Sequence, residues 1–179
     1  MLTITIPGGE LYDETDNSFI HVDEETITLE HSLVSLSKWE SKWCKPYLKE
    51  ELKSTEEIID YIRCMTLTEN VNPLIYNFIT DENLEQITEY IEAPMTATTF
   101  SNIVGSNNHE IVTAELIYYW MVTFRIPFEC ENWHLNKLIT FIRVCSIKNT
   151  PQKKMSQSEI MSQNRAVNEA RKKAMNTKG

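Results

Sequence analysis

The side chains that can build a hydrophobic core are concentrated before residue 148. Residues 148–179 hold eight Lys and Arg against two Glu, about +6, while the whole 179-residue chain carries −9 and residues 1–147 therefore carry −15. The apolar residues of this last segment form only a thin stripe: Ile160, Val167, Ala170 and Ala174. Because helices are stabilised mainly by the surface they bury, the sequence predicts an acidic folded body and a basic helical tail.

Length and composition are typical of a single globular domain. The chain is 41% hydrophobic and 24% charged, which suffices for one core. Its first nine residues lack the basic and apolar regions of a secretory signal, and no apolar run reaches the roughly 18 residues that cross a bilayer. The four cysteines are widely spaced, so we expect reduced thiols in a cytoplasmic protein without a membrane segment.

The first thirty residues favour strands. Leu2–Ile6 alternates apolar and polar side chains, and Pro7-Gly8-Gly9 is expected to stop it. Two more β runs, 19–22 and 26–29, flank the acidic stretch 23–25, which reads as a turn. A small antiparallel ribbon is therefore expected.

From residue 32 onward the apolar spacing favours helices. Expected helices begin near residues 32, 54, 80, 110, 132 and 157, and residues 54–57 form a capping box. The segments 110–124 and 132–147 have the widest apolar faces, so we expect them to pack antiparallel at the centre of the core. Residues 95–108 are polar and are expected to form a mobile loop.

These elements predict an α+β, mostly α-helical fold. A small N-terminal β-ribbon, residues 1–30, precedes helices over 32–149, and together they form a single globular domain, 1–149. A projecting basic helix follows in the tail, 150–179.

No grouping of residues indicates a catalytic or metal centre. Cys130 and His134 form one pair, whereas specific zinc sites carry two. The acidic clusters near residues 13–16 and 23–25 lack the alternation and the glycine of a calcium loop and are expected to be solvated turns. Neither phosphate-binding glycine motif is present. We expect no enzyme activity, no metal and no cofactor.

The tail is the strongest candidate for a partner-binding surface. Its candidate contact residues are Arg165, Asn168, Arg171, Lys172 and Lys173. The apolar stripe would dock on another protein while the basic side chains select an acidic face, which includes the body of another copy or of the same chain. Nucleic acid is a weaker alternative, because aromatic residues for base stacking are missing. A solvated helix without a partner is a third interpretation.

Trp39 and Trp43 are the second, weaker candidates. They follow each other at helical spacing within SKWESKW, where charged residues separate them. This spacing favours packing in the core; the alternative is that one indole stays partly exposed and anchors a partner.

Two stretches carry a family resemblance. One is 31–43, HSLVSLSKWESKW; the other runs from Trp133-His134-Leu135 through Lys153-Lys154-Met155-Ser156 and Asn164-Arg165-Ala166-Val167-Asn168 to Thr177-Lys178-Gly179. Together they resemble the tail assembly chaperones of long-tailed, siphovirus-type bacteriophages. The resemblance covers about half of the chain.

The resemblance implies a non-enzymatic protein in the cytoplasm of the infected bacterial host. Such proteins bind the tape measure protein, keep it soluble and help tail-tube subunits assemble around it, and many also exist in a longer frameshifted form. Two alternatives stay open: a structural virion component, such as a connector or baseplate subunit, and a nucleic-acid-binding regulator acting through the basic tail.

Overall fold

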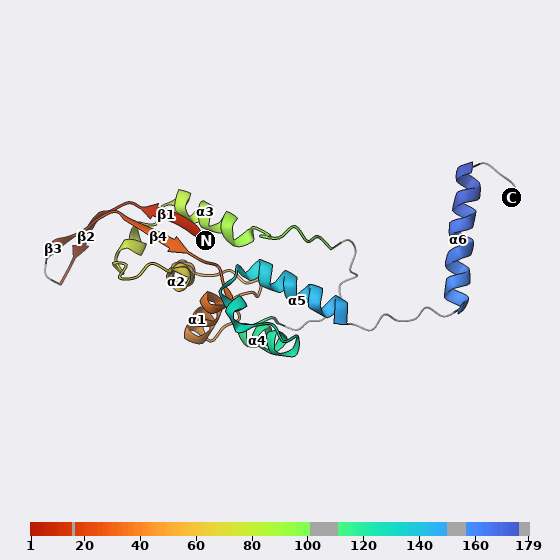
Figure 1. The fold of residues 1–179 in the computed structure, drawn as a ribbon. Helices are drawn as coiled ribbons and strands as arrows, with labels where there is room; N and C mark the ends of the chain where they lie inside the picture. Colours follow the sequence, from red (N-terminus) through yellow and green to blue (C-terminus); the bar gives the residue numbers. More distant parts are fainter. Residues whose placement is uncertain (16, 101–110, 150–156, 176–179) are drawn as a thin grey trace. The chain divides into compact units, whose positions relative to one another are not determined.

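The computed structural model describes residues 1–15, 17–100, 111–149 and 157–175 (Figure 1). It contains two compact units, Met1–Ser146 and Ile147–Gly179. In the described residues, four strands at the N-terminus precede six α-helices, so the predicted α+β, mostly helical class is confirmed. The expected loop over 95–108 falls largely on residues 101–110, which lie outside the described residues.

The four strands form one long, kinked hairpin (Figure 1). Strand β1 (Leu2–Ile6) pairs antiparallel with β4 (Glu25–Leu29), and β2 (Gly9–Asp13) pairs antiparallel with β3 (Ser18–Val22). Leu2 faces Leu29 and Gly9 faces Val22, so the residue numbers of every facing pair add up to 31. The register is therefore continuous, and pairing is interrupted only where residues 7–8 lie opposite residues 23–24.

This hairpin differs from the predicted ribbon in two places. Residues 7–9 only interrupt the strand, because the chain returns to extended structure as β2 at Gly9. A Cβ on Gly9 would lie 2.2 Å from the Phe78 ring, so glycine serves close packing here rather than a turn. Residues 23–25 do not reverse the chain; the reversal comes between Asp13 and Ser18.

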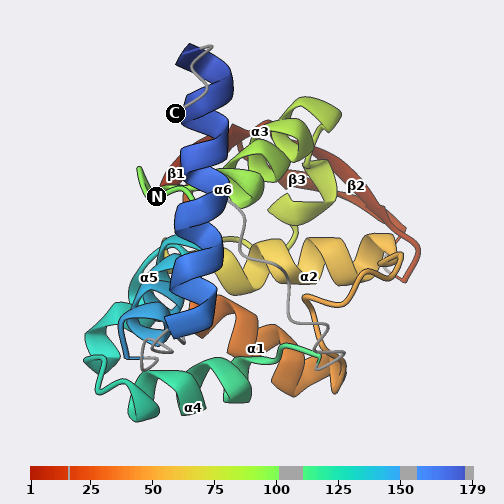
Figure 2. The same cartoon turned by 90° about the vertical axis from the view of Figure 1, so that its right-hand side faces the viewer.

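Five α-helices begin within the described residues of the first unit, and side chains cap the starts of four of them. The five are α1 (Leu33–Trp43), α2 (Thr55–Met65), α3 (Asp81–Glu92), α4 (Ala114–Thr123) and α5 (Leu135–Asn149), with short 3₁₀ turns η1 (Ile75–Phe78) and η2 (Phe128–Asn132). Hydroxyls of Ser32, Ser54, Thr80 and Thr113 accept backbone N–H groups at the starts of α1 to α4. The predicted capping box at Ser54 is confirmed. In Figure 2, α4, α1 and α2 lie one above the other.

The apolar core has two parts. The first, the ribbon cluster, joins the hairpin to α2 and α3: Ile4, Ile6, Val22, Ile27, Leu29, Trp39, Tyr61, Ile62, Met65, Ile75, Tyr76, Ile87 and Tyr90. The second, the α4–α5 cluster, holds Leu33, Leu36, Ala114, Ile117, Met121, Ile126, Cys130, Leu135, Leu138 and Ile142. The predicted pair of helices therefore builds one cluster rather than the centre of the whole core, and α1 contributes to both.

The predicted core faces of α4 and α5 are also wider than the buried ones. Ile111 and Phe141 belong to the apolar residues of the predicted helical segments 110–124 and 132–147, yet they are 49% and 38% exposed. On α4 only Ala114, Ile117 and Met121 are buried. Helix α1 packs against only one side of this cluster, so apolar residues on the other side remain at the surface.

The buried carboxylate of Glu40 fixes the start of α4 against α1. Its Oε1 accepts the Tyr47 N–H at 2.8 Å, and its Oε2 accepts the Ala114 N–H, the first of α4, at 2.7 Å. Burial raises the pKa of Glu40, while these two hydrogen bonds act in the opposite direction. A carboxylate at a helix N-terminus also interacts favourably with the positive end of the helix dipole.

Replacing Glu40 with Gln should lower the free energy of unfolding by about 1–3 kcal/mol, because the amide nitrogen would face one of these N–H donors and leave it unpaired. Urea denaturation of the full chain measures the change. Glu50→Gln, at an exposed position, is the matched control and should stay close to wild type. Equal stability of the two variants would contradict this role of Glu40.

Candidate partner-binding surfaces

Helix α6 (Gln157–Met175) carries the predicted tail residues. Arg165, Asn168, Arg171 and Lys172 are all exposed, whereas the side chain of Lys173 lies outside the described residues. Three large apolar side chains among the described residues of α6 are exposed as well: Met161 (68%), Val167 (44%) and Met175 (72%). The described side chains of α6 therefore offer both charge and apolar surface to a partner.

The predicted basic residues of α6 do not form one patch. Arg165, Asn168 and Lys172 follow each other at intervals of three and four, so they share a face. Met161 lies on that same face, together with Asn164 and Glu169. Arg171 instead follows Val167 by four residues and flanks the apolar stripe. The sequence pattern had not separated these two groups.

Trp39 and Trp43 occupy different environments on α1. Trp39 is 1% exposed, and its Nε1 donates to the Glu57 backbone oxygen at 2.9 Å. Trp43 stacks on it, with ring centroids 6.0 Å apart, but is only partly buried. Trp39 therefore serves the core, and of the two only Trp43 presents surface to solvent.

The exposed edge of Trp43 is held by charged neighbours. Its Nε1 donates to Oδ2 of Asp60 at 2.8 Å, and Lys42 pairs with the other oxygen of that carboxylate. Burial favours a higher pKa for Asp60, but the hydrogen bonds from Lys42 and Trp43 outweigh it and leave the pKa lowered. A shallow hollow opens beside them, lined by Lys42, Trp43, Glu56, Ile59, Asp60, Arg63 and Asn77. Its mixed charge favours neither an anion nor a cation.

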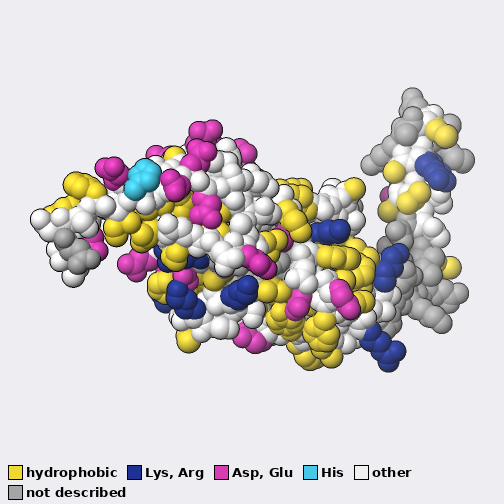
Figure 3. Space-filling model, turned by 60° about the vertical axis from the view of Figure 1, so that its left-hand side comes forward, with side chains coloured by type: hydrophobic (Ala, Val, Ile, Leu, Met, Phe, Trp, Pro, Cys, Tyr) yellow, Lys and Arg dark blue, Asp and Glu magenta, His cyan; other side chains and the backbone are white. Residues whose placement is uncertain are grey.

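Sequence reasoning missed a third surface, on α4 and α5. A shallow, largely apolar hollow is lined by Leu48, Lys49, Ile111, Val112, Trp120 and Ile139. Next to it in the sequence, Tyr119 (63%), Val122 (62%) and Phe128 (55%) are exposed. Hydrophobic side chains also gather at this end of the body in the space-filling view (Figure 3). The signal was present in the sequence, since residues 114–123 include a single charged residue.

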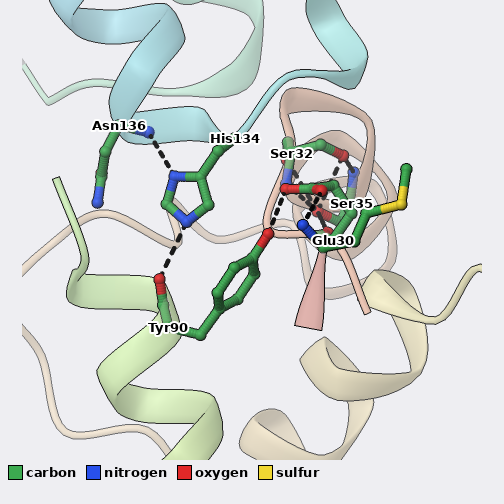
Figure 4. Close-up of polar contacts among 7 residues, drawn as sticks. Glu30, Ser32, Ser35, Tyr90, His134 and Asn136 are labelled. Carbon is green, nitrogen blue, oxygen red and sulfur yellow. Dashed lines mark hydrogen bonds and ion pairs between the residues drawn. The ribbon is translucent and has the colours of Figure 1, made fainter. Parts of the chain in front are cut away.

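A buried polar cluster joins the N-terminal hairpin to α3 and α5 (Figure 4). The Tyr90 hydroxyl donates to Oε1 of Glu30 at 2.7 Å, and the other oxygen of Glu30 pairs with the Met1 amino group at 3.0 Å. Burial, and then the neighbouring Glu30 carboxylate, raise the pKa of Tyr90. His31 is hydrogen-bonded through Nδ1 to the Tyr61 hydroxyl at 2.6 Å.

The protonation of His134 follows from its neighbours. Its Nε2 lies 3.0 Å from the carbonyl oxygen of Tyr90, which can only accept, so this nitrogen carries the hydrogen (Figure 4). Its Nδ1 then accepts the Asn136 N–H at 3.3 Å. Burial lowers the pKa of His134, in keeping with a neutral ring. With both nitrogens used in this way, His134 holds the fold together rather than offering a ligand beside Cys130.

Comparison with models of protein families, with curated proteins and with solved structures finds no match to this chain. Within the described residues, no group of three or more His, Cys, Asp or Glu side chains is placed to hold a metal ion. No helix in the same part of the chain has both the length and the apolar composition needed to cross a bilayer. What the protein binds is therefore inferred from its own surfaces.

Acidification should destabilise the protein through His31. Burial and the neighbouring His134 lower the pKa of His31 from 6.5 to about 3. The unfolded chain therefore binds a proton at this histidine more readily than the folded chain does. The contribution of His31 to the free energy of unfolding is fully present above pH 6.5 and decreases as the pH drops from there toward 3. By this linkage, the His31 contribution at pH 5 is about 2 kcal/mol less favourable than at pH 8.

Urea denaturation at pH 5 and pH 8 tests this contribution. His31→Asn, which keeps an acceptor for Tyr61, should lose about 2 kcal/mol less than wild type on acidification. His21→Asn, at an exposed site on the hairpin, should behave like wild type. The assignment to His31 fails if the His31 variant loses as much stability as wild type does.

Proposed function

We propose that this chain is a non-enzymatic tail assembly chaperone of a long-tailed bacteriophage. It binds the tape measure protein in the cytoplasm of the infected host and promotes assembly of the tail-tube protein around it. The observation that carries the proposal is α6, where Met161, Val167 and Met175 are exposed on a helix that also presents Arg165 and Lys172. The resemblance of residues 31–43 and of the C-terminal stretch to such chaperones supports it.

The chemistry of α6 suits a client of this kind. A long helical client exposes apolar stripes until the tube encloses it, and an amphipathic helix is a common means of binding such a stripe. Methionine side chains are flexible and adapt to irregular apolar surfaces. Modest affinity at each contact would allow tube subunits to displace the chaperone.

The exposed apolar side chains of α4 favour a second candidate function, a structural virion component. Tyr119 and Val122 are each more than half exposed, as expected of a subunit that is covered by neighbours in a permanent assembly. The two functions differ in where the protein is found. A connector or baseplate subunit stays in purified virions, whereas a chaperone is absent from them.

Co-expression with the tape measure protein of the same phage tests the chaperone. The full chain should keep the client soluble and co-purify with it. Replacing Met161, Val167 and Met175 together with Asp should remove most of the co-purified client, because the exposed apolar surface of α6 is lost. Leu52→Asp, at a fully exposed site in the body, is the control and should retain binding.

Two outcomes would redirect the proposal. If the α6 variant binds and solubilises the client as well as wild type does, α6 is not the client surface. If the wild-type chain neither binds nor rescues the client but is present in purified virions, the structural component is the better assignment. Client-independent binding to nucleic acid that weakens steeply with salt would instead support a regulator.

A further inference from the structure

Helix α4 is apolar on nearly all sides, yet one side of it faces solvent. Glu115 is the only charged residue in Ala114–Thr123. A helix of this composition is normally buried all round, but Tyr119 is 63% and Val122 62% exposed. Phe128, soon after the helix, is 55% exposed. The outer face of α4 therefore has the composition of an interface.

Four exposed residues define this face: Glu115, Tyr119, Val122 and Arg125. Glu115, Tyr119 and Val122 follow each other at intervals of four and three, which places them along one stripe of α4, and Arg125 lies just beyond the C-terminal end of the helix. Its ends carry opposite charges and its middle is apolar. Neither Glu115 nor Arg125 forms an ion pair with another described residue.

Arg125 also occupies a backbone position that favours glycine. Its φ is 55°, in the left-handed region. Its N–H donates to the Val122 oxygen at 3.1 Å, and the Ile126 N–H donates to the Met121 oxygen at 2.8 Å. These two bonds are the Schellman end of a helix, where the left-handed residue is usually glycine. The backbone at the end of α4 would be served at least as well by glycine. We therefore look for the role of the Arg125 side chain in a contact that it makes.

We propose that α4 is the interface of a homodimer, in which the helices of two copies pack antiparallel about a two-fold axis between Tyr119 and Val122. Reversing the stripe brings Glu115 of each copy beside Arg125 of the other. The ion pair therefore forms twice, at the two ends of an apolar centre made by Tyr119 and Val122. A polar rim around an apolar core is the usual anatomy of protein interfaces.

The charge order selects a second copy over other occupants. A stripe that reads acidic, apolar, basic is complementary to itself when it is reversed, as an isologous contact requires. A basic helix such as α6 would be attracted to Glu115 and repelled by Arg125. This inference does not depend on the proposed chaperone function.

Sedimentation velocity of the full chain tests the dimer. Wild type should pass from monomer to dimer between about 1 and 100 µM, the range of a modest interface. Glu115→Arg and Arg125→Glu should each raise the dimer dissociation constant at least about tenfold, because both ion pairs become like-charge contacts. Combining them restores both pairs with reversed sign, so the double variant should return to within about threefold of wild type.

Arg125→Gly separates the two roles of this position. Glycine suits the left-handed backbone, so the melting temperature of this variant at dilute, monomeric concentration should not fall, while its dimer dissociation constant should rise. The proposal is overturned if wild type remains monomeric throughout, or if the double charge swap fails to recover dimerisation. It is equally overturned if the dimer tolerates both single variants but is lost with Val167→Asp, since α6 would then be the contact.

Discussion

Helix α1 has to pack against two apolar clusters at once, and the first unit depends on how it does so. Trp39 enters the ribbon cluster, while Leu33 and Leu36 enter the α4–α5 cluster. Polar side chains on the buried sides of such a helix cannot hydrogen-bond to water, so the Glu40 carboxylate requires hydrogen-bond donors within the protein. No buried side-chain nitrogen or oxygen in the described part of the chain lacks a hydrogen-bond partner. Moving α1 would break these bonds together with both clusters.

Much of the local structure could be predicted because its causes are local. The capping box at Ser54, the alternation in Leu2–Ile6 and the apolar spacing of the helices each depend on residues within one or two turns. Strand β2 was not predicted, because Gly9 was interpreted as part of a turn. In the structure its lack of a side chain leaves room for the ring of Phe78, which is distant in the sequence. The hairpin register likewise depends on pairing partners up to 27 residues apart, Leu2 and Leu29.

The candidate surfaces were predicted less completely, for the same reason. Helical spacing placed Trp39 and Trp43 on one face, but only the fold shows that Glu57 and Asp60 of α2 receive their indole N–H groups. The contact between Glu40 and Ala114 spans 74 residues. The exposure of Tyr119 and Val122 was not foreseen, because an apolar helix is expected to be buried and nothing in the sequence shows which side its neighbours cover.

The division of the core has a consequence for synthesis on the ribosome. Every residue of the ribbon cluster, including its partly buried rim, lies between Leu2 and Ile91. That half can therefore condense as soon as those residues have left the exit tunnel. The α4–α5 cluster joins Leu33 and Leu36 to residues as late as Cys145, so this face of α1 stays uncovered while more than fifty further residues are translated. We therefore expect a half-folded stage during synthesis, in which this apolar face is open to aggregation or to host folding factors.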